Sequence, residues 1–231
     1  MTLAWIEESQ LGIGEGAREA ALREAVPEWF GKHAGAPKEP VWMTMDGFWI
    51  GVCEVTQKQW ESVMGSNPSY FRGEELAVAS KRGDLPVECV SWDDCMEFCR
   101  RTGLRLPTEM EWQMAHAMLW QYLGNPWSWN AGNSGNRTHP VGRSYAGQAG
   151  LFDMDGNVSE WCADWFGEWP EASATNYAGP ATGTARVVCG GCWCGDDWFD
   201  VRIRKDRLSL PPACRYNSVG FRVCLTPSLA E

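Results

Sequence analysis

The sequence predicts an α+β domain in which two to three helices, short strands and much loop share one chain. Helix-capping signals occur three times in the first half of the chain. From Gly124 onward, glycine, asparagine, serine and tryptophan dominate and helical periodicity fades. Short apolar runs in this part, such as "RVVCG" and "VGFRVC", are typical of strands separated by long loops.

The chain divides into an N-terminal segment and a main body. Residues 1–40 are acidic and alanine-rich, and the stretch "GEGAREAALREAVPEWFGKH" predicts one or two short helices. Pro37 and Pro40 close this segment, so we expect an N-terminal helical extension that packs on the domain formed by residues 41–231. That domain opens with "VWMTMDGFWIGVCEV", whose alternation of apolar and polar residues predicts a pair of strands around an Asp-Gly turn.

Three capping boxes predict the helices. Each one pairs a Ser or Thr with a side-chain acceptor three residues later: Thr56 with Gln59, Ser91 with Asp94, and Thr108 with Glu111. Gly65 and Gly103 end the first two helices, and the third continues to about Leu123. Cys95 and Cys99 lie four residues apart on one face of the second helix, a spacing that favours core packing over a mutual bridge.

The overall composition excludes some classes of partner. A net charge of −10 makes a nucleic-acid backbone an unsuitable partner, because an acidic surface repels phosphates. No apolar run reaches the roughly 18 residues that a membrane helix needs, so we expect no membrane span. The start "MTLAWIEESQLGIGEG" lacks the features of a secretory signal, and we expect that any targeting signal was removed or never existed. Fifteen tryptophans suit a core rich in loops or a contact surface.

The ten cysteines leave the redox state open, because a secreted chain would use them as bridges and a cytosolic chain as thiols or ligands. Five lie in apolar surroundings and are predicted to be buried thiols: Cys53, Cys89, Cys95, Cys99 and Cys162. Cys189, Cys192 and Cys194 have the spacing of a dithiol redox pair or of part of a zinc site. Strand-like flanks and the lack of a fourth zinc ligand disfavour both, while a bridge between two of the three stays open.

Six stretches, in order, resemble the sulfatase-modifying factor, or formylglycine-generating enzyme, family over roughly residues 42–225. They are "EVTQKQWESVMGSNPSYF", "LPVECVSWDDCMEFC", "RLPTEMEWQMA", "GNSGNRTHPVG", "GLFDMDGNVSEWCADW" and "GFRV". The resemblance implies a C-type-lectin-like fold, in which few strands and two helices support long loops. The lectin-like label describes topology and does not imply sugar binding.

The family includes oxidases that convert a substrate cysteine to formylglycine with copper and a cysteine pair. The positions that match this pair are Gly195 and Asp200, and neither residue has the thiolate that Cu(I) prefers. Cys194 lies one residue before Gly195. Because neighbouring residues on a strand face opposite sides, its thiol would not take the place of the missing one. Iron-dependent relatives use histidines of a separate domain, but the histidines here are scattered: His33, His116 and His139. A copper- or iron-dependent oxidase, with Cys194 as the best-placed ligand, is therefore the alternative to a non-catalytic function.

The stretch "DMDGNVSEW" resembles the calcium-binding stretch of some relatives. By position, the resemblance assigns the ligands to side-chain oxygens of Asp153 and Glu160 and to the carbonyls of Gly156 and Val158. Hard oxygen ligands suit Ca²⁺. The same composition is typical of a tight turn with local hydrogen bonds. Both interpretations stay open, and a calcium-stabilised structural module is a further alternative function. We expect no cofactor other than a structural calcium ion.

Another branch of the family consists of the variable proteins of diversity-generating retroelements, in which the C-terminal codons are rewritten to change a binding surface. Here the anchors "GG-W" and "GFR" enclose Cys194 to Val219, and the resemblance implies a rewritten region of about 186–224. Arg207, Pro212 and Arg215 keep the family spacing. The candidate ligand-binding residues between them are Cys194, Asp196, Asp197, Trp198, Phe199, Asp200, Leu208, Ser209, Leu210, Tyr216, Asn217 and Ser218.

The composition of this segment agrees with that branch. Mutagenesis of adenines in asparagine codons cannot reach Trp, Gln, Met, Lys or Glu. Only Trp198 and Lys205 in the segment belong to that group, whereas average usage would place roughly five there. Trp198 and Phe199 beside acids have the composition of an interface hot spot, although both rings also suit a core position beneath the loops.

We therefore expect a non-catalytic, receptor-type ligand-binding protein that is closest in character to the retroelement variable proteins. The resemblance implies a macromolecular partner, either a protein or a surface glycan, and a location at the cell surface. We expect the protein to be a monomer.

Overall fold

The computed structural model describes residues 1–13, 41–72, 84–117, 128–143, 149–195 and 208–226. Three helices and ten strands lie within these ranges. In chain order they are β1 (Leu3–Ile6), β2 (Ser9–Ile13), β3 (Val41–Met45), β4 (Phe48–Gly51), α3 (Gln57–Met64), α4 (Trp92–Thr102), α5 (Glu109–Ala117), β5 (Ser159–Trp165), β6 (Ala174–Thr175), β7 (Arg186–Cys189), β8 (Leu208–Leu210), β9 (Val219–Gly220) and β10 (Cys224–Leu225). The α+β class predicted from the sequence is confirmed.

The first 13 residues differ from the helical extension expected for residues 1–40. β1 pairs antiparallel with β4, and β2 pairs antiparallel with β3, so both belong to the sheets of the domain. Ile6 is buried, and Trp5 lies opposite Trp49 in the neighbouring strand. Pairing with long-range partners therefore decides the structure of this segment. The stretch predicted to be helical, residues 14–33, lies outside the described residues.

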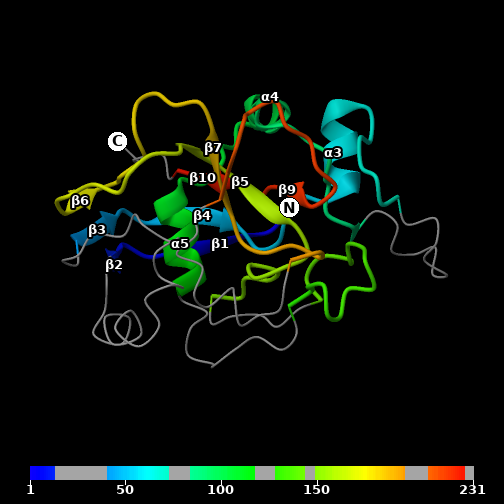
Figure 1. Ribbon diagram of the computed structural model, residues 1–231, viewed down its shortest axis with the longest axis horizontal. Helices are drawn as coiled ribbons and strands as arrows, with labels where there is room; N and C mark the ends of the chain where they lie inside the picture. The colour runs from blue at the N-terminus through cyan, green and yellow to red at the C-terminus, as the bar shows by residue number, and fades with distance from the viewer. Residues whose placement is uncertain (14–40, 73–83, 118–127, 144–148, 196–207, 227–231) are drawn as a thin grey trace, which may run out of the picture.

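The described strands form three small sheets, with the orders β1-β4-β10, β2-β3-β6 and β8-β7-β5-β9. β3 and β4 are both present on either side of Asp46 and Gly47, as predicted, but they enter different sheets and do not pair as a hairpin. β1 and β10, from opposite ends of the chain, flank β4 near the centre of the molecule (Figure 1). β5 pairs antiparallel with β7 and parallel with β9.

The three capping boxes are confirmed. In α3 and α4, the Thr56 and Ser91 hydroxyls accept from the main chain of the third helical residue, which bonds back to the cap. At the start of α5, Thr108 and Glu111 exchange the same pair of hydrogen bonds. α3 and α4 end at glycines with left-handed φ angles of 82° and 71°. α5 is described to Ala117, and its predicted continuation lies outside the described residues.

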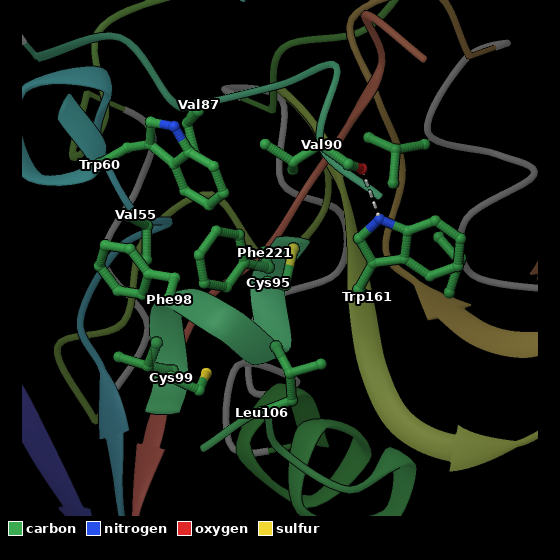
Figure 2. Packing of buried hydrophobic residues seen from close by; sticks show 13 residues of the cluster. Val55, Trp60, Val87, Val90, Cys95, Phe98, Cys99, Leu106, Trp161 and Phe221 are labelled. Carbon is green, nitrogen blue, oxygen red and sulfur yellow. Dashed lines mark hydrogen bonds between the residues drawn. The ribbon is translucent and has the colours of Figure 1, made fainter. Parts of the chain in front are cut away.

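The helices α3 and α4 pack on the sheet β8-β7-β5-β9 through an aromatic core (Figure 2). The rings of Trp60, Phe98 and Phe221 lie with centroids 5.4 to 5.9 Å apart. In the same core, Trp161 donates its indole N–H to the carbonyl of Val90 at 3.0 Å. Because Phe221 follows β9 directly, this core holds the main chain that closes the C-terminal segment.

Three of the cysteines predicted to be buried thiols are buried as expected, namely Cys95, Cys99 and Cys162. Cys53 and Cys89 are only half-buried. No disulfide bond joins any of the ten cysteines in this structure. None of the described helices is long and apolar enough to cross a bilayer.

Candidate functional site

The candidate ligand-binding residues fall into a described and an undescribed group. Cys194, Leu208 and Tyr216 are exposed, the last two by 39% and 49%. Four more are half-buried: Ser209, Leu210, Asn217 and Ser218. The remaining five lie outside the described residues: Asp196, Asp197, Trp198, Phe199 and Asp200. The described members lie before and after this gap, at the edge strand β8 and next to β9.

The main chain holds the three residues before β9. The carbonyl of Tyr216 accepts from the N–H of Cys89 at 3.0 Å. The carbonyl of Asn217 accepts from the indole N–H of Trp193 at 3.0 Å. The carbonyl of Ser218 accepts from the N–H of Ser159 at 2.9 Å. Three successive candidate positions are thus fixed by main-chain acceptors, which every amino acid carries.

One side chain in this segment does serve as an anchor. Arg215 forms a two-pronged ion pair with Asp94 of α4, at 2.8 and 2.9 Å. Partial burial alone would raise the pKa of Asp94, but its bonds from Arg215 and Ser91 lower that pKa below its ordinary value. Arg215 therefore ties the segment to the capping box of α4, in agreement with the family spacing that set it apart in the sequence.

A neighbouring loop extends the surface beyond the segment. Trp193 lies edge-on against Phe71, with centroids 5.3 Å apart, and Phe71 lies edge-on against Tyr70 at 4.9 Å. Tyr70 is 69% exposed. Tyr70 was not among the ligand-binding residues predicted from the sequence. The two adjacent aromatic residues of "PSYF", in a predicted loop, could have indicated it, because large apolar side chains in a loop are often exposed for binding.

The positions expected to carry oxidase chemistry hold no thiol. Gly195 has no side chain, and Asp200 lies outside the described residues. The two described histidines have other partners. His116 contacts Asp155 at 2.6 Å, and His139 stacks on Trp129 with its Nε2 2.7 Å from the carbonyl of Ser134. Burial lowers the pKa of His139. Within the described ranges, no group of three or more His, Cys, Asp or Glu side chains has the arrangement of a metal site.

The residues of the CGGC motif do not pair with each other. The Cys189 sulfur lies 3.5 Å from that of buried Cys162 in the neighbouring strand. The Cys192 sulfur lies 3.4 Å from that of Cys194. The motif therefore contributes one cysteine to the core and one to an exposed turn.

The stretch assigned to calcium forms a tight turn with internal hydrogen bonds. Glu160 is fully buried, and its two oxygens accept from Arg222 at 2.6 and 2.7 Å; one also accepts from Trp112. Asp153, with a φ of 58°, accepts from the N–H of Gly142 at 2.6 Å. A buried guanidinium already neutralises Glu160 and would repel a divalent ion.

The two other assigned positions are also packed structurally. Val158 is buried, and Gly156 lies so close to Trp129 that a Cβ atom would come within 2.4 Å of its carbonyl oxygen. Glycine is required there by this close approach. Because Glu160 is paired with a buried guanidinium, we propose that this stretch is a structural turn and that its four positions hold no calcium ion.

Calcium removal is accordingly expected to leave the melting temperature unchanged within about 1 °C. A folded-state site saturated at 100 times its Kd would add about 2.7 kcal/mol, which corresponds to several degrees for a domain of this size. Thermal unfolding followed by circular dichroism, with EDTA, with millimolar calcium and with magnesium as the control, measures this. A melting temperature that falls by 5 °C or more on chelation and is restored by calcium alone would contradict the interpretation that Glu160 is the ion-pair partner of Arg222 and not a calcium ligand.

Comparison with known proteins places this geometry in a family. Residues 10–227 match the family described as the sulfatase-modifying factor enzyme 1-like domain. The chain is 31% identical over 216 residues to the chaperone protein LppX of Paenibacillus barcinonensis, covering 65% of this chain and 71% of that protein. It is 32% identical over 204 residues to the formylglycine-generating enzyme of Thermomonospora curvata, covering 73% of this chain and 64% of the enzyme.

A solved structure supports the same assignment. Treponema denticola variable protein 1 superposes with a TM-score of 0.78 at 27% identity, over 97% of this chain and 95% of that one. The agreement extends over nearly the whole of both chains, so the likeness concerns the complete domain. The chain belongs to the family of the sulfatase-modifying factor enzyme 1-like domain and has its C-type-lectin-like α+β fold.

Proposed function

We propose that this protein is a non-catalytic, receptor-type ligand-binding protein, the variable protein of a diversity-generating retroelement, and that residues 194–218 form its binding surface. The observation that carries the proposal is the main-chain anchoring of Tyr216, Asn217 and Ser218. Because these bonds use only the main-chain carbonyls of the three residues, their side chains can change while the scaffold stays intact. The likeness to the Treponema denticola variable protein over nearly both whole chains supports the same function.

The chemistry of the surface suits a macromolecular ligand, either a protein or a surface glycan. Tyr70 and Tyr216 are exposed by 69% and 49%, and tyrosines combine apolar area with a hydrogen-bonding hydroxyl. The net charge of −10 disfavours nucleic acid. We propose a monomer at the cell surface, because a receptor of this type must meet its ligand there.

An oxidase function is not proposed, although formylglycine-generating enzymes are among the relatives. The two positions that match their cysteine pair are Gly195 and Asp200. A soft Cu(I) ion needs thiolates, and neither residue supplies one.

Replacing Trp198, Phe199 and Tyr216 together with alanine is expected to leave the melting temperature within about 2 °C of wild type, since surface substitutions cost little. Phe98→Ala is the matched control, because Phe98 is buried between Trp60 and Phe221 and its removal should cost about 3–5 kcal/mol. Thermal unfolding distinguishes the two. A triple variant as unstable as Phe98→Ala would show that the rings belong to the core.

A displayed library tests binding directly. Leu208, Tyr216, Asn217 and Ser218 are randomised on phage and selected against purified lysozyme and an immobilised glycan mixture. We expect folded clones that bind one target with micromolar affinity or better, as a tolerant recognition surface should. A matched library at Trp60, Phe98 and Phe221 should yield no folded clones. Failure of the first library to fold would contradict the proposal.

The retroelement itself is tested in the neighbouring DNA. A reverse transcriptase gene and an adenine-rich near-copy of the segment that codes for residues 186–224 are expected beside the gene. Their absence would leave a ligand-binding module without a means of diversification.

A further inference from the structure

Two thiols touch on an exposed turn next to the candidate surface. The sulfurs of Cys192 and Cys194 are 3.4 Å apart. Cys194 is exposed and Cys192 is half-buried. The N–H of Gly195 donates to the carbonyl of Cys192 at 3.0 Å and closes a β-turn over these residues. The turn holds both side chains on one side, within reach of solvent.

The turn is held from outside by three hydrogen bonds. The N–H of Trp193 donates to the carbonyl of Asn157 at 2.8 Å, and the Ser134 hydroxyl donates to the carbonyl of Trp193 at 2.8 Å. The N–H of Ala131 donates to the carbonyl of Gly195 at 2.9 Å. The relative placement of the two thiols is therefore set by the scaffold, and bringing them together costs little further entropy.

A second thiol pair has almost the same spacing but no access. Cys162 and Cys189 have sulfurs 3.5 Å apart, and these residues are 0% and 5% exposed. A reagent from solution must reach a sulfur to react with it. Because the two pairs have similar sulfur–sulfur distances but different solvent exposure, comparing their reactivity shows the effect of exposure alone.

We propose that Cys192 and Cys194 are a modification site: they form a reversible disulfide by exchange with a low-molecular-weight disulfide such as oxidised glutathione. The Cys194 thiolate attacks one sulfur of the reagent, which forms a mixed disulfide and releases one thiol. Cys192, after losing its proton, attacks the Cys194 sulfur and releases the second thiol. The protein pair gives up two electrons and two protons, and the reagent becomes two thiols.

The geometry favours this reaction over metal binding. Closure needs the two sulfurs to approach from 3.4 Å to the bonded distance of about 2.05 Å. A tetrahedral zinc site would instead need four ligands with sulfurs about 3.8 Å apart, from a Zn–S distance of about 2.3 Å. Two thiols provide half of that set, and no group of three metal-ligating side chains occurs in the part of the chain that the structure describes.

The exchange is expected to be slow at neutral pH and faster in alkali. Partial burial and the neighbouring Cys192 thiol raise the pKa of Cys194 to about 11. Because only the thiolate attacks, the rate should rise roughly tenfold per pH unit between pH 7 and 10. The site thus resembles a slowly equilibrating structural switch more than a fast redox sensor.

The test uses the full chain in mixtures of reduced and oxidised glutathione at pH 8.5, followed by alkylation of the remaining thiols and mass spectrometry. We expect wild type to lose two alkylatable thiols, with fragmentation spectra that join Cys192 to Cys194. Cys192→Ser should stop at a glutathione adduct on Cys194, and Cys194→Ser should show neither the adduct nor the bond at this turn. Cys214→Ser, which removes a half-buried cysteine elsewhere in the segment, should leave the yield unchanged.

Three outcomes would overturn the inference. They are a stable glutathione adduct on wild-type Cys194 without ring closure, a disulfide between other cysteines, and equal reaction of the buried Cys162–Cys189 pair under native conditions. The test does not depend on the proposed ligand-binding function, because it measures the bond itself. A failure here would leave the main-chain anchoring of residues 216–218 untouched.

Discussion

Arg222→Met is expected to lower the free energy of unfolding by about 3–5 kcal/mol, because it leaves a buried carboxylate without its partner. Arg222 is fully buried and donates twice to Glu160, at 2.6 and 2.7 Å. It also donates to the carbonyls of Gly51 and Phe152, at 2.9 and 3.0 Å. One guanidinium therefore joins β4, β5 and the C-terminal segment.

The electrostatics of the surroundings explain the size of this effect. Burial opposes the charge of Arg222, but the ion pair with Glu160 more than offsets it, so the pKa of Arg222 is raised. Burial, together with the charges of Asp153 and Glu160, raises the pKa of the nearby Glu54 well above its ordinary value. Removing Arg222, a cationic neighbour of these acids, would leave them to repel one another in the interior.

Urea unfolding at pH 7 measures this loss. Arg215→Met is the matched control, since its pair with Asp94 lies at the surface, with side chains 53% and 30% exposed, and should contribute less than about 1 kcal/mol. The double variant Arg222→Met with Glu160→Gln should lose less than the sum of the two single losses, because the unpaired charge is gone. Equal losses for Arg222→Met and Arg215→Met would refute the structural importance of the buried pair.

Asp164→Asn is expected to stabilise the protein increasingly as the pH rises from 5 to 8.5. Asp164 is 2% exposed, and burial together with the charge of Glu109 raises its pKa from 3.8 to about 7, against the bond from the main chain of Glu109. The folded state thus favours the protonated acid. Its contribution to stability is fully present below about pH 4 and is lost as the pH rises through 7, a change on the order of 4 kcal/mol.

Asparagine keeps an acceptor for the N–H of Glu109, which Asp164 binds at 2.7 Å at the start of α5. We therefore expect the two proteins to have similar stability near pH 4, and the variant to be about 2–4 kcal/mol more stable at pH 8.5. Urea titrations at several pH values measure the difference. Asp164→Ala, which lacks the acceptor, should be less stable than asparagine at every pH. Parallel curves for wild type and Asp164→Asn across this range would show that Asp164 is ionised throughout.

The thiol pairs illustrate where sequence reasoning reached its limit. The sequence presented Cys189 and Cys192 as a CxxC motif, but Cys189 contacts Cys162, which lies 27 residues away. Cys192 contacts Cys194 because the β-turn at Gly195 brings alternate residues together. A strand would have placed these two side chains on the same face but farther apart. Local spacing did not determine either contact, because each depends on which strand or turn the residue joins.

The N-terminal segment shows the same limit for strands. Alternation predicted β3 and β4, yet it could not show that one joins β2 and β6 while the other joins β1 and β10. Strand partners are determined by long-range hydrogen bonding and burial, and neither can be predicted from a short segment of the sequence. Composition alone favoured helix for residues 1–40, while pairing with β3 and β4 decided residues 3–13.

By itself, the sequence determined the α+β class and the helix starts at Thr56, Ser91 and Thr108. It also showed that the residues at positions 195 and 200, Gly195 and Asp200, carry no thiol. These features depend on hydrogen bonds within one turn of chain or on the identity of single residues. Only the tertiary structure decided that Glu160 pairs with Arg222, 62 residues away, and that main-chain carbonyls hold residues 216–218. The physical reason is that a buried charge and a main-chain acceptor are satisfied by whatever the fold brings near them.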